Sequence, residues 1–235
     1  VPPAAQIAFA GITGPRLLPG AYTVRMTKDE KPYETKLTVS LDRRDKFTEA
    51  DRKAQYEAAM KVHALFGDES ALMDRVLILR SSLTKSSEAL AGDEALRKTV
   101  ADFDTKVDTV RKLIVATKEG GAVTGEERLR EHSDKLYGAI LSYEGKPADY
   151  QLASIDALRR ELGDATNEFE QLIEKDLPAL NETLKAKGQQ PISPPPAKVA
   201  VKDSDLRSGG VLNGAADRDL PVVTSWLPAD FRLLH

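Results

Sequence analysis

Residues 19–41 read PGAYTVRMTKDEKPYETKLTVSL, and this stretch decides how the rest of the chain is interpreted. Apolar or near-apolar positions alternate with polar ones in both halves: Tyr22, Val24, Met26, then Thr35, Leu37, Val39, Leu41. A period of two is typical of a β-strand with one buried face. The polar residues 28–32 have the length of a hairpin connection, and Pro32 is expected to make the second strand begin at Tyr33. The stretch therefore predicts an antiparallel β-hairpin with one apolar face.

This hairpin is incomplete by itself, because two strands are marginally stable in water unless further strands or a helix cover them. The cover could come from the helical sequence that follows, or the chain could be the last part of a larger protein. The end of the chain also gathers apolar residues: Leu220, Val222, Val223, Trp226, Leu227, Phe231, Leu233 and Leu234. An exposed apolar patch of that size would promote aggregation or binding to other proteins. We expect this tail to pack against the hairpin or the helices, with a strand at residues 221–226.

After the hairpin the apolar period changes from 2 to 3.6, which predicts helices. Residues 48–51, Thr-Glu-Ala-Asp, fit a capping box, so the first helix is expected to begin near residue 49 and to run to about residue 90. Gly67 lies within it as an interruption and not as a stop. A second helix follows the break at residues 92–93 and is expected to end at the glycine pair 120–121. Its regular stripe comprises Leu96, Val100, Phe103, Val107, Val110 and Ile114.

Two further helices are predicted in the second half of the chain. The third covers about residues 125–144, and the fourth begins near Pro147 and runs to Gly188, with a bend or break at Pro178. Four helices with short connections favour an up-and-down antiparallel four-helix bundle. The expected fold class is α+β, mainly α, with a small N-terminal antiparallel β element. The expected domains are residues 1–45 (hairpin or end of a β-sandwich), 46–190 (bundle) and 191–235 (a Pro/Gly-rich tail that packs back).

Composition excludes several functional classes. The 235 residues are 41% hydrophobic, 30% charged and 6% aromatic, which is typical of a soluble, helix-rich protein. The net charge of −3 comes from 34 basic and 37 acidic residues spread along the chain, so nucleic acid is not an expected partner. The absence of cysteine excludes disulfides, thiolate nucleophiles and Cys-ligated zinc. No apolar run has the length of a membrane span, and the start at Val1 leaves room for a removed targeting segment.

The histidines do not predict a metal site. His63 lies on the apolar stripe of the first helix, where a hydrogen-bonded core histidine is favoured over a ligand or base. Bundle di-iron sites use Glu-x-x-His, but Met60 and Leu129 stand three residues before His63 and His132. His-Glu-x-x-His is absent as well, and His235 is terminal. We therefore expect no metal and no other cofactor.

Carboxylates are plentiful, and a glycosidase would need two of them across a sugar site. The candidates are Asp102, Asp104 and Asp108 on one helix, and Glu126, Glu127 and Glu131 near the start of the next. Solvated helix faces carry such residues routinely. Because there is no Gly-x-Ser-x-Gly elbow and no phosphate-binding glycine loop, we assign no catalytic or cofactor-binding residue to this chain.

Two other features have a functional and a structural interpretation. Residues 43–46, Arg-Arg-Asp-Lys, form a short basic cluster between the sheet and the bundle. The cluster could contact phosphate or a partner, although a salt bridge at the junction or a solvated linker is favoured. Trp226 could stack on a sugar, but as the only tryptophan among Val and Leu it is better explained as an anchor of the tail.

Several motifs, in this order along the chain, resemble a known family. They are Gly14-Pro15, Leu18-Pro-Gly-Ala-Tyr-Thr-Val-Arg25, Lys36-Leu-Thr-Val39, Leu41-Asp-Arg43 and Asp176-Leu-Pro-Ala-Leu-Asn181. Over about residues 11–192 the chain is similar to the C-terminal region of bacterial sortilin-like, BNR-repeat β-propeller proteins, which are often labelled glycosyl hydrolases. In that family a Pro-Gly-x-Tyr-x-Val strand ends a small β-sandwich, and a helical bundle closes with Asp-Leu-Pro-x-Leu-Asn. Arg43 departs from the family, which commonly has proline there, and the residues after Ser193 match no known pattern.

The propeller itself is missing, because no Ser-x-Asp-x-Gly-x-Thr-Trp box occurs in these residues. The resemblance therefore implies a non-catalytic C-terminal structural or protein-interaction module of an exported bacterial protein, periplasmic or extracellular. Its partner would be its own upstream propeller or another protein, and its oligomeric state is left open. One alternative is an accessory part of a glycoside-hydrolase-like (BNR/sialidase-like) enzyme whose active site lies in the absent propeller. A stand-alone ligand-binding bundle is a further alternative.

Overall fold

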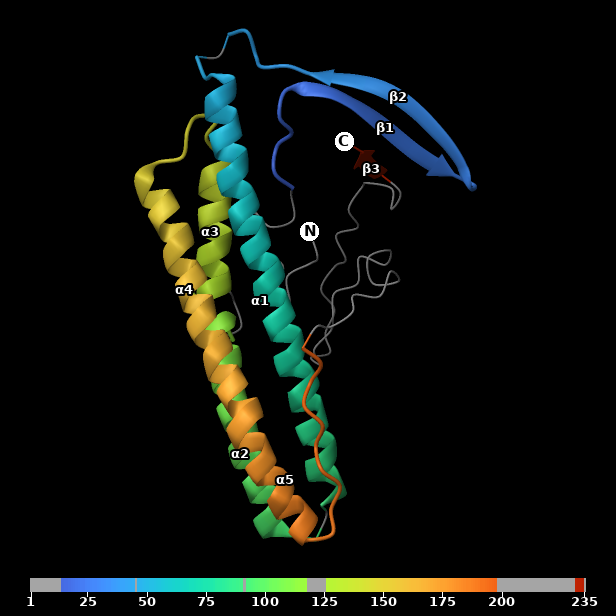
Figure 1. Cartoon of the computed structure of the whole chain (residues 1–235), viewed down its shortest axis with the longest axis vertical. Helices are drawn as coiled ribbons and strands as arrows, with labels where there is room; N and C mark the ends of the chain where they lie inside the picture. The colour runs from blue at the N-terminus through green and yellow to red at the C-terminus, as the bar shows by residue number, and fades with distance from the viewer. Residues whose placement is uncertain (1–13, 45, 91, 118–125, 198–230, 235) are drawn as a thin grey trace.

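The fold is a long helical bundle with a β-hairpin at one end (Figure 1). The computed structural model describes residues 14–44, 46–90, 92–117, 126–197 and 231–234. The strands are β1 (Gly20–Lys28), β2 (Lys31–Val39) and β3 (Phe231–Leu234), and the helices are α1 (Glu49–Ala89), α2 (Glu94–Ile114), α3 (Leu129–Leu141), α4 (Asp149–Gln171), the π-helical turn η2 (Leu172–Asp176) and α5 (Leu177–Ala186). The predicted α+β, mainly-α class with a helix bundle is confirmed. None of the described helices is long and apolar enough to cross a membrane.

The hairpin is present, but its turn is tighter than predicted. Asp29 and Glu30 form a two-residue turn with φ values of 49° and 63°, the sign that a type I′ hairpin turn requires. β2 therefore begins at Lys31, and Pro32 lies inside it opposite Thr27. The prediction that Pro32 delays the strand to Tyr33 was wrong. Proline is tolerated here because β2 is an edge strand of the described sheet, whose order is β2-β1-β3.

The third strand comes from the end of the chain. β3 pairs antiparallel with β1, with Phe231 opposite Met26 and Leu234 opposite Thr23. The tail thus contributes a strand to the hairpin, although the predicted strand at residues 221–226 lies outside the described residues. Among the described elements, neither hairpin strand packs on a helix. The bundle therefore does not cover the hairpin.

Helix α1 begins and ends where the sequence predicts. The Asp51 amide donates to the Thr48 hydroxyl at 3.2 Å, and the Thr48 amide donates to the Asp51 carboxylate at 2.9 Å. This reciprocal pair is a capping box, which satisfies two amides at the helix start. The 41 residues of α1 span about 60 Å at 1.5 Å per residue. Gly67 lies within the helix without interrupting it.

Helices α2 and α3 follow one another in a single column beside α1. The Arg80 guanidinium of α1 bonds Asp104 of α2 at 3.0 Å, while the Gln55 amide near the start of α1 donates to the Ile140 carbonyl of α3 at 2.8 Å. The later residue of α1, Arg80, thus contacts the earlier part of the column, and the earlier residue, Gln55, contacts the later part. Both α2 and α3 therefore run antiparallel to α1. Figure 1 shows α2 and α3 end to end along the length of α1.

The third column consists of α4, η2 and α5, which are continuous and run parallel to α1. Asp68 of α1 forms an ion pair with Arg159 of α4, and Arg75, one to two turns later, forms one with Glu170. The alternating course of an up-and-down bundle is kept, with α1 in one direction, α2 and α3 in the other, and α4 to α5 back again (Figure 1).

The middle helices are shorter than predicted. α2 ends at Ile114, because Val115 is extended (φ −129°, ψ 143°), and the glycine pair at residues 120–121 lies outside the described residues. α3 covers Leu129–Leu141 instead of about residues 125–144, and α4 begins at Asp149, two residues after Pro147. The apolar stripe of α2 is nevertheless fully buried: Leu96, Val100, Phe103, Val107, Val110 and Ile114.

Proline 178 explains the π-helical turn. A proline inside a helix cannot donate a hydrogen bond, and its ring clashes with the carbonyl four residues earlier. Here the turn preceding Pro178, η2, is wider than an α-helical turn, and the helix continues through it into α5. The prediction that Pro178 bends or breaks the helix is thus replaced by a local widening.

Helix α5 ends in a Schellman motif. Gly188 has φ +71°, which glycine adopts without strain. Its amide donates to the Lys185 carbonyl at 2.9 Å, and the Gln189 amide donates to the Leu184 carbonyl at 2.9 Å. The predicted C-cap at Gly188 is confirmed. The chain then reverses and runs back along α1 (Figure 1).

The returning segment, residues 189–196, is here called the strap. Ile192 and Pro195 are buried, and the residues between and beside them are exposed. Asn181 of α5 fixes the strap with two hydrogen bonds to the backbone of Ile192: its amide donates to the carbonyl at 2.9 Å, and its side-chain oxygen accepts from the N–H at 2.7 Å. The strap therefore adds a buried side chain to the core of the bundle.

The hairpin is joined to the bundle through a small aromatic contact, here called the neck. The rings of Phe47 and Tyr143 meet edge to face with centroids 5.1 Å apart. Gly145 lies against both rings, because a Cβ there would stand 2.7 Å from Phe47 and 2.6 Å from Tyr143. Arg16, before the hairpin, forms an ion pair with Glu144 in the same loop.

Candidate functional site

The described histidines do not converge on a site. His63 is half-buried on α1, and burial lowers its pKa. The His132 Nε2 atom lies 3.6 Å from a carboxylate oxygen of Glu127, and His235 is outside the described residues. Within the described part of the chain, no group of three or more His, Cys, Asp and Glu residues is placed to hold a metal ion.

Two of the candidate aspartates belong to an ion-pair network between α1 and α2. Arg80 makes a bidentate pair with Asp104, with both N–O distances 3.0 Å, and a further contact of 2.6 Å with Asp108. Arg111 and Lys112 also reach Asp108, at 2.6 Å and 2.7 Å. Partial burial opposes ionisation of Asp108, but the hydrogen bonds from Arg111 and Lys112 and the charge of Arg80 outweigh it and lower the pKa to about 2. This network fastens α2 to α1.

The candidate glutamates tie the end of α2 to the start of α3. An oxygen of Glu131 accepts from the backbone N–H of Ala116 at 3.2 Å, and Glu126 accepts from the N–H of Thr117 at 3.0 Å. The same Glu131 oxygen accepts from the N–H of Arg128 at 2.9 Å, where it caps α3. These backbone bonds were not predicted, because the second helix was expected to continue to the glycine pair at residues 120–121, which placed Ala116 and Thr117 inside it.

The remaining sequence candidates are peripheral. Asp102 is exposed on α2. In the basic cluster, Arg44 pairs with Asp42 at 2.7 Å and Arg43 is exposed, so the described part of the cluster forms a local linker contact. Trp226 lies outside the described residues. Among the described residues, the aspartates, the glutamates, the histidines and the basic cluster therefore do not form one common site.

A buried polar cluster at the α1–α3 contact was missed by the sequence analysis. Glu69 and Ser70 come from α1 and Arg130 and Ser133 from α3; all four side chains are buried. The Ser133 hydroxyl donates to Glu69 at 2.6 Å, and Arg130 donates to the Ser70 hydroxyl at 3.1 Å. The sequence signal that could have identified this cluster is the helical position of Glu69. It lies three residues after the buried Phe66, on the apolar stripe of α1, where a side chain is expected to be buried.

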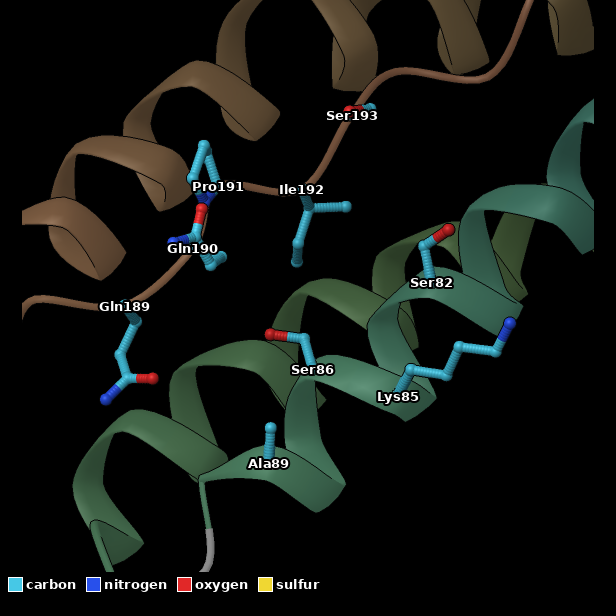
Figure 2. A pocket seen from close by; sticks show the side chains of 9 residues that line it. All are labelled: Ser82, Lys85, Ser86, Ala89, Gln189, Gln190, Pro191, Ile192 and Ser193. Atoms are coloured by element: carbon cyan, nitrogen blue, oxygen red, sulfur yellow. The ribbon is translucent and has the colours of Figure 1, made fainter.

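A shallow hollow lies between the end of α1 and the strap (Figure 2). It has a volume of about 380 Å³ and is lined by Ser82, Lys85, Ser86 and Ala89 of α1 and by residues 189–193. Figure 2 shows the Ile192 side chain pointing from the strap toward α1. Hydroxyls, amides and one amine line the hollow, and no carboxylate pair faces it.

Three of the seven exposed large hydrophobic side chains of the described residues lie together on the hairpin. The register places Tyr22 opposite Leu37 and Met26 opposite Tyr33, so these positions share one face. Met26, Tyr33 and Leu37 are 42%, 46% and 45% exposed. At the other end of the face, Tyr22 is buried and its hydroxyl donates to the Leu18 carbonyl at 2.7 Å. This surface is called the hairpin face below.

Comparisons of the chain with protein-family models, with curated proteins and with solved structures found no match.

Proposed function

We propose that the chain is a non-catalytic structural and protein-interaction module, the C-terminal part of a larger exported protein whose β-propeller precedes it. The exposure of the hairpin face carries this proposal. Met26, Tyr33 and Leu37 stand together on two paired strands that no described helix touches. Exposing an apolar sheet face to water is unfavourable in free energy, and proteins usually cover such a face with a second layer of strands or helices.

The proposed occupant of the hairpin face is a second β-sheet from the upstream part of the same polypeptide. Stacked sheets pack face to face about 10 Å apart and interdigitate alternate side chains. The hairpin face offers such alternate positions in register across β1 and β2. The opposite face carries Thr23, Arg25 and Lys36, which form polar contacts of their own, such as the 2.6 Å bond from Lys36 to Thr23. Only one face is therefore suited to burial.

The candidate carboxylates support the non-catalytic part of the proposal. Asp104 and Asp108 are engaged by arginine and lysine side chains, and Glu131 by backbone amides. A carboxylate that is held by cations with its pKa near 2, as Asp108 is, is poorly suited to act as a general acid at neutral pH. A periplasmic or extracellular location is part of the same proposal and rests on the family resemblance.

Hydroxyl-radical footprinting of Met26 and Tyr33 tests the proposal. Their reactivity is compared between this chain and a longer polypeptide that includes the residues encoded upstream of it. We expect the longer protein to protect both side chains at least about fivefold, because a second sheet would exclude water from them. Leu37→Lys should abolish the protection, while Thr38→Lys, on the opposite face, should leave it intact. Equal reactivity in the two proteins, or an upstream sequence without propeller blades, would refute the proposal.

A further inference from the structure

Two charged side chains lie in the interior of the bundle where α1 meets α3. Glu69 is 0% exposed and Arg130 is 1% exposed, and the serines beside them are buried as well. Charged side chains are almost never fully buried unless they are paired. A well-packed apolar pair would hold the two helices at least as firmly. The stability of the bundle therefore does not by itself explain these residues.

The cluster is only partly satisfied by hydrogen bonds. One oxygen of Glu69 accepts from Ser133, and one nitrogen of Arg130 donates to Ser70. The Oε2 atom of Glu69 and the Nε and Nη1 atoms of Arg130 have no hydrogen-bond partner within the described structure. No ion pair within 4.0 Å joins the two side chains there either. A fully ionised Glu69 is thus held by a single serine hydroxyl and by a charge at longer range.

Helix α3 depends on polar contacts more than its neighbours do. Of its six buried residues, Arg130 and Ser133 are polar, whereas every buried residue of α2 is apolar. Its C-terminal end is held by Gln55, which donates to the Ile140 carbonyl, and its N-terminal end by Glu131. A change in charge beside these contacts therefore acts on a short helix of 13 residues, in which four of the buried residues are apolar.

We propose that the α1–α3 contact is a pH-responsive latch, in which ionisation of the buried Glu69 side chain weakens the docking of α3 on α1 as the pH rises. The neutral acid loses less solvation on burial than the carboxylate does. The protonated form can also donate a hydrogen bond, so Oε2 is no longer restricted to accepting. This latch is independent of the proposed function.

The sign follows from the direction of the pKa shift. Burial raises the pKa of Glu69 from 4.5 to about 7, although the Ser133 hydroxyl and the Arg130 charge oppose the rise. Because the folded-state pKa lies above the unfolded one, the stabilisation is complete below pH 4.5 and is lost as the pH rises through 7. The difference between the two pKa values of Glu69 corresponds to a total change of up to about 300-fold in the opening equilibrium of α3, from below pH 4.5 to above pH 7.

The other charged groups around Glu69 come from all three columns. They are Asp68 and Asp74 on α1, Arg130 and Glu131 on α3, and Arg159 on α4, which pairs with Asp68. Burial lowers the pKa of Arg130, but a guanidinium is not deprotonated in proteins, so the positive charge that Arg130 presents to Glu69 is constant. Burial raises the pKa of Asp74 too, but this side chain is only half-buried.

Hydrogen exchange of the whole chain between pH 5 and pH 8.5, corrected for the intrinsic exchange rate, tests the latch. We expect the opening of the α3 amides to rise by up to about 70-fold over this range, because part of the total change lies below pH 5, while the amides of α2 change little. Glu69→Gln should remove the dependence, because the amide is neutral at every pH. Glu88→Gln, at an exposed position of the same helix, should behave like the wild type.

Ser133→Ala gives a second readout that does not require a Glu69 variant. It removes the hydroxyl that donates to Glu69 in the described structure. Because this hydrogen bond lowers the pKa of Glu69, its removal should move the midpoint of α3 opening to higher pH. A wild-type profile that is flat, a Glu69→Gln profile that still rises, or an equal loss of protection in α2 would overturn the proposal. If Glu69→Gln does not fold, the wild-type profile and the direction of the Ser133→Ala shift decide.

Discussion

Replacing Asn181 with alanine should detach the strap and leave the bundle folded. Asn181 makes both hydrogen bonds that hold the backbone of Ile192, at 2.9 Å and 2.7 Å. Each such bond contributes about 1 kcal/mol net, so the variant loses about 2 kcal/mol of docking free energy. Burial of the Ile192 side chain, which is 6% exposed, contributes a similar amount of about 2 kcal/mol and opposes detachment. We therefore expect the detachment equilibrium of the strap to rise about 30-fold.

The comparison of two substitutions makes this prediction specific. Asn181→Asp keeps an oxygen that can accept from the Ile192 N–H, but it places a second carboxylate oxygen where Asn181 donated to the Ile192 carbonyl. We expect this variant to detach the strap at least as strongly as Asn181→Ala at pH 7, because two acceptors then face each other. Asn167→Ala, at an exposed position of α4, is the control and should have no effect.

Amide exchange at Ile192 and limited proteolysis after residue 188 measure strap detachment directly. The expected result is faster exchange at Ile192 in both Asn181 variants, with unchanged protection in the centres of α1 and α2. If the Ile192 amide stays protected within about twofold in Asn181→Ala, the two side-chain bonds do not hold the strap. An Asn181→Asp variant with wild-type exchange at pH 7 would refute the assigned directions of those bonds.

Two other perturbations follow from the geometry. Asp108→Asn should lower the free energy of unfolding by about 1–2 kcal/mol at pH 7, because the variant loses its ion pairs with Arg111 and Lys112 and solvent partly screens these pairs. Asp102→Asn, at an exposed position of the same helix, should leave the free energy of unfolding unchanged. Because the folded-state pKa of Asp108 is about 2, below the ordinary 3.8, this difference is present above pH 4 and should shrink as the pH falls toward 2 in urea titrations. Gly145→Ala should cost about 1–3 kcal/mol, since its Cβ would overlap both rings of the neck, whereas Gly163→Ala, whose Cβ meets open space inside α4, should raise the melting temperature. Thermal denaturation that ranks the two alanine variants in the opposite order would contradict the neck geometry.

The parts of the fold that sequence predicts well are those with a local code. The capping box at residues 48–51 and the six-residue stripe of α2 depend on contacts within a few residues, and both were confirmed. The hairpin was also confirmed, but its turn was misplaced. Pro32 was treated as a barrier to the strand, and its effect depends on whether the strand is an edge, which only the assembled sheet determines.

The parts that sequence analysis missed depend on distant partners. After α2 ends at Ile114, the backbone amides of Ala116 and Thr117 donate to Glu131 and Glu126, near the start of α3. The apolar period of the sequence does not predict hydrogen bonds of this kind. The same applies to Asn181, whose partner lies eleven residues further on, in a proline-rich stretch. Glu69 was not singled out from the sequence, although its position three residues after Phe66, on the apolar stripe of α1, is one that the structure buries.

The pairing of β3 with β1 has a consequence for the order of folding. The paired residues Arg25 and Arg232 are separated by about two hundred residues, and the entropy lost on closing a loop rises with its length. Formation of the bundle and docking of the strap bring the chain back along α1 before β3 pairs, so only the residues after the strap remain to be closed. β3 should therefore join the sheet last, and a variant that detaches the strap should slow this final step while the hairpin and the bundle form at their usual rates.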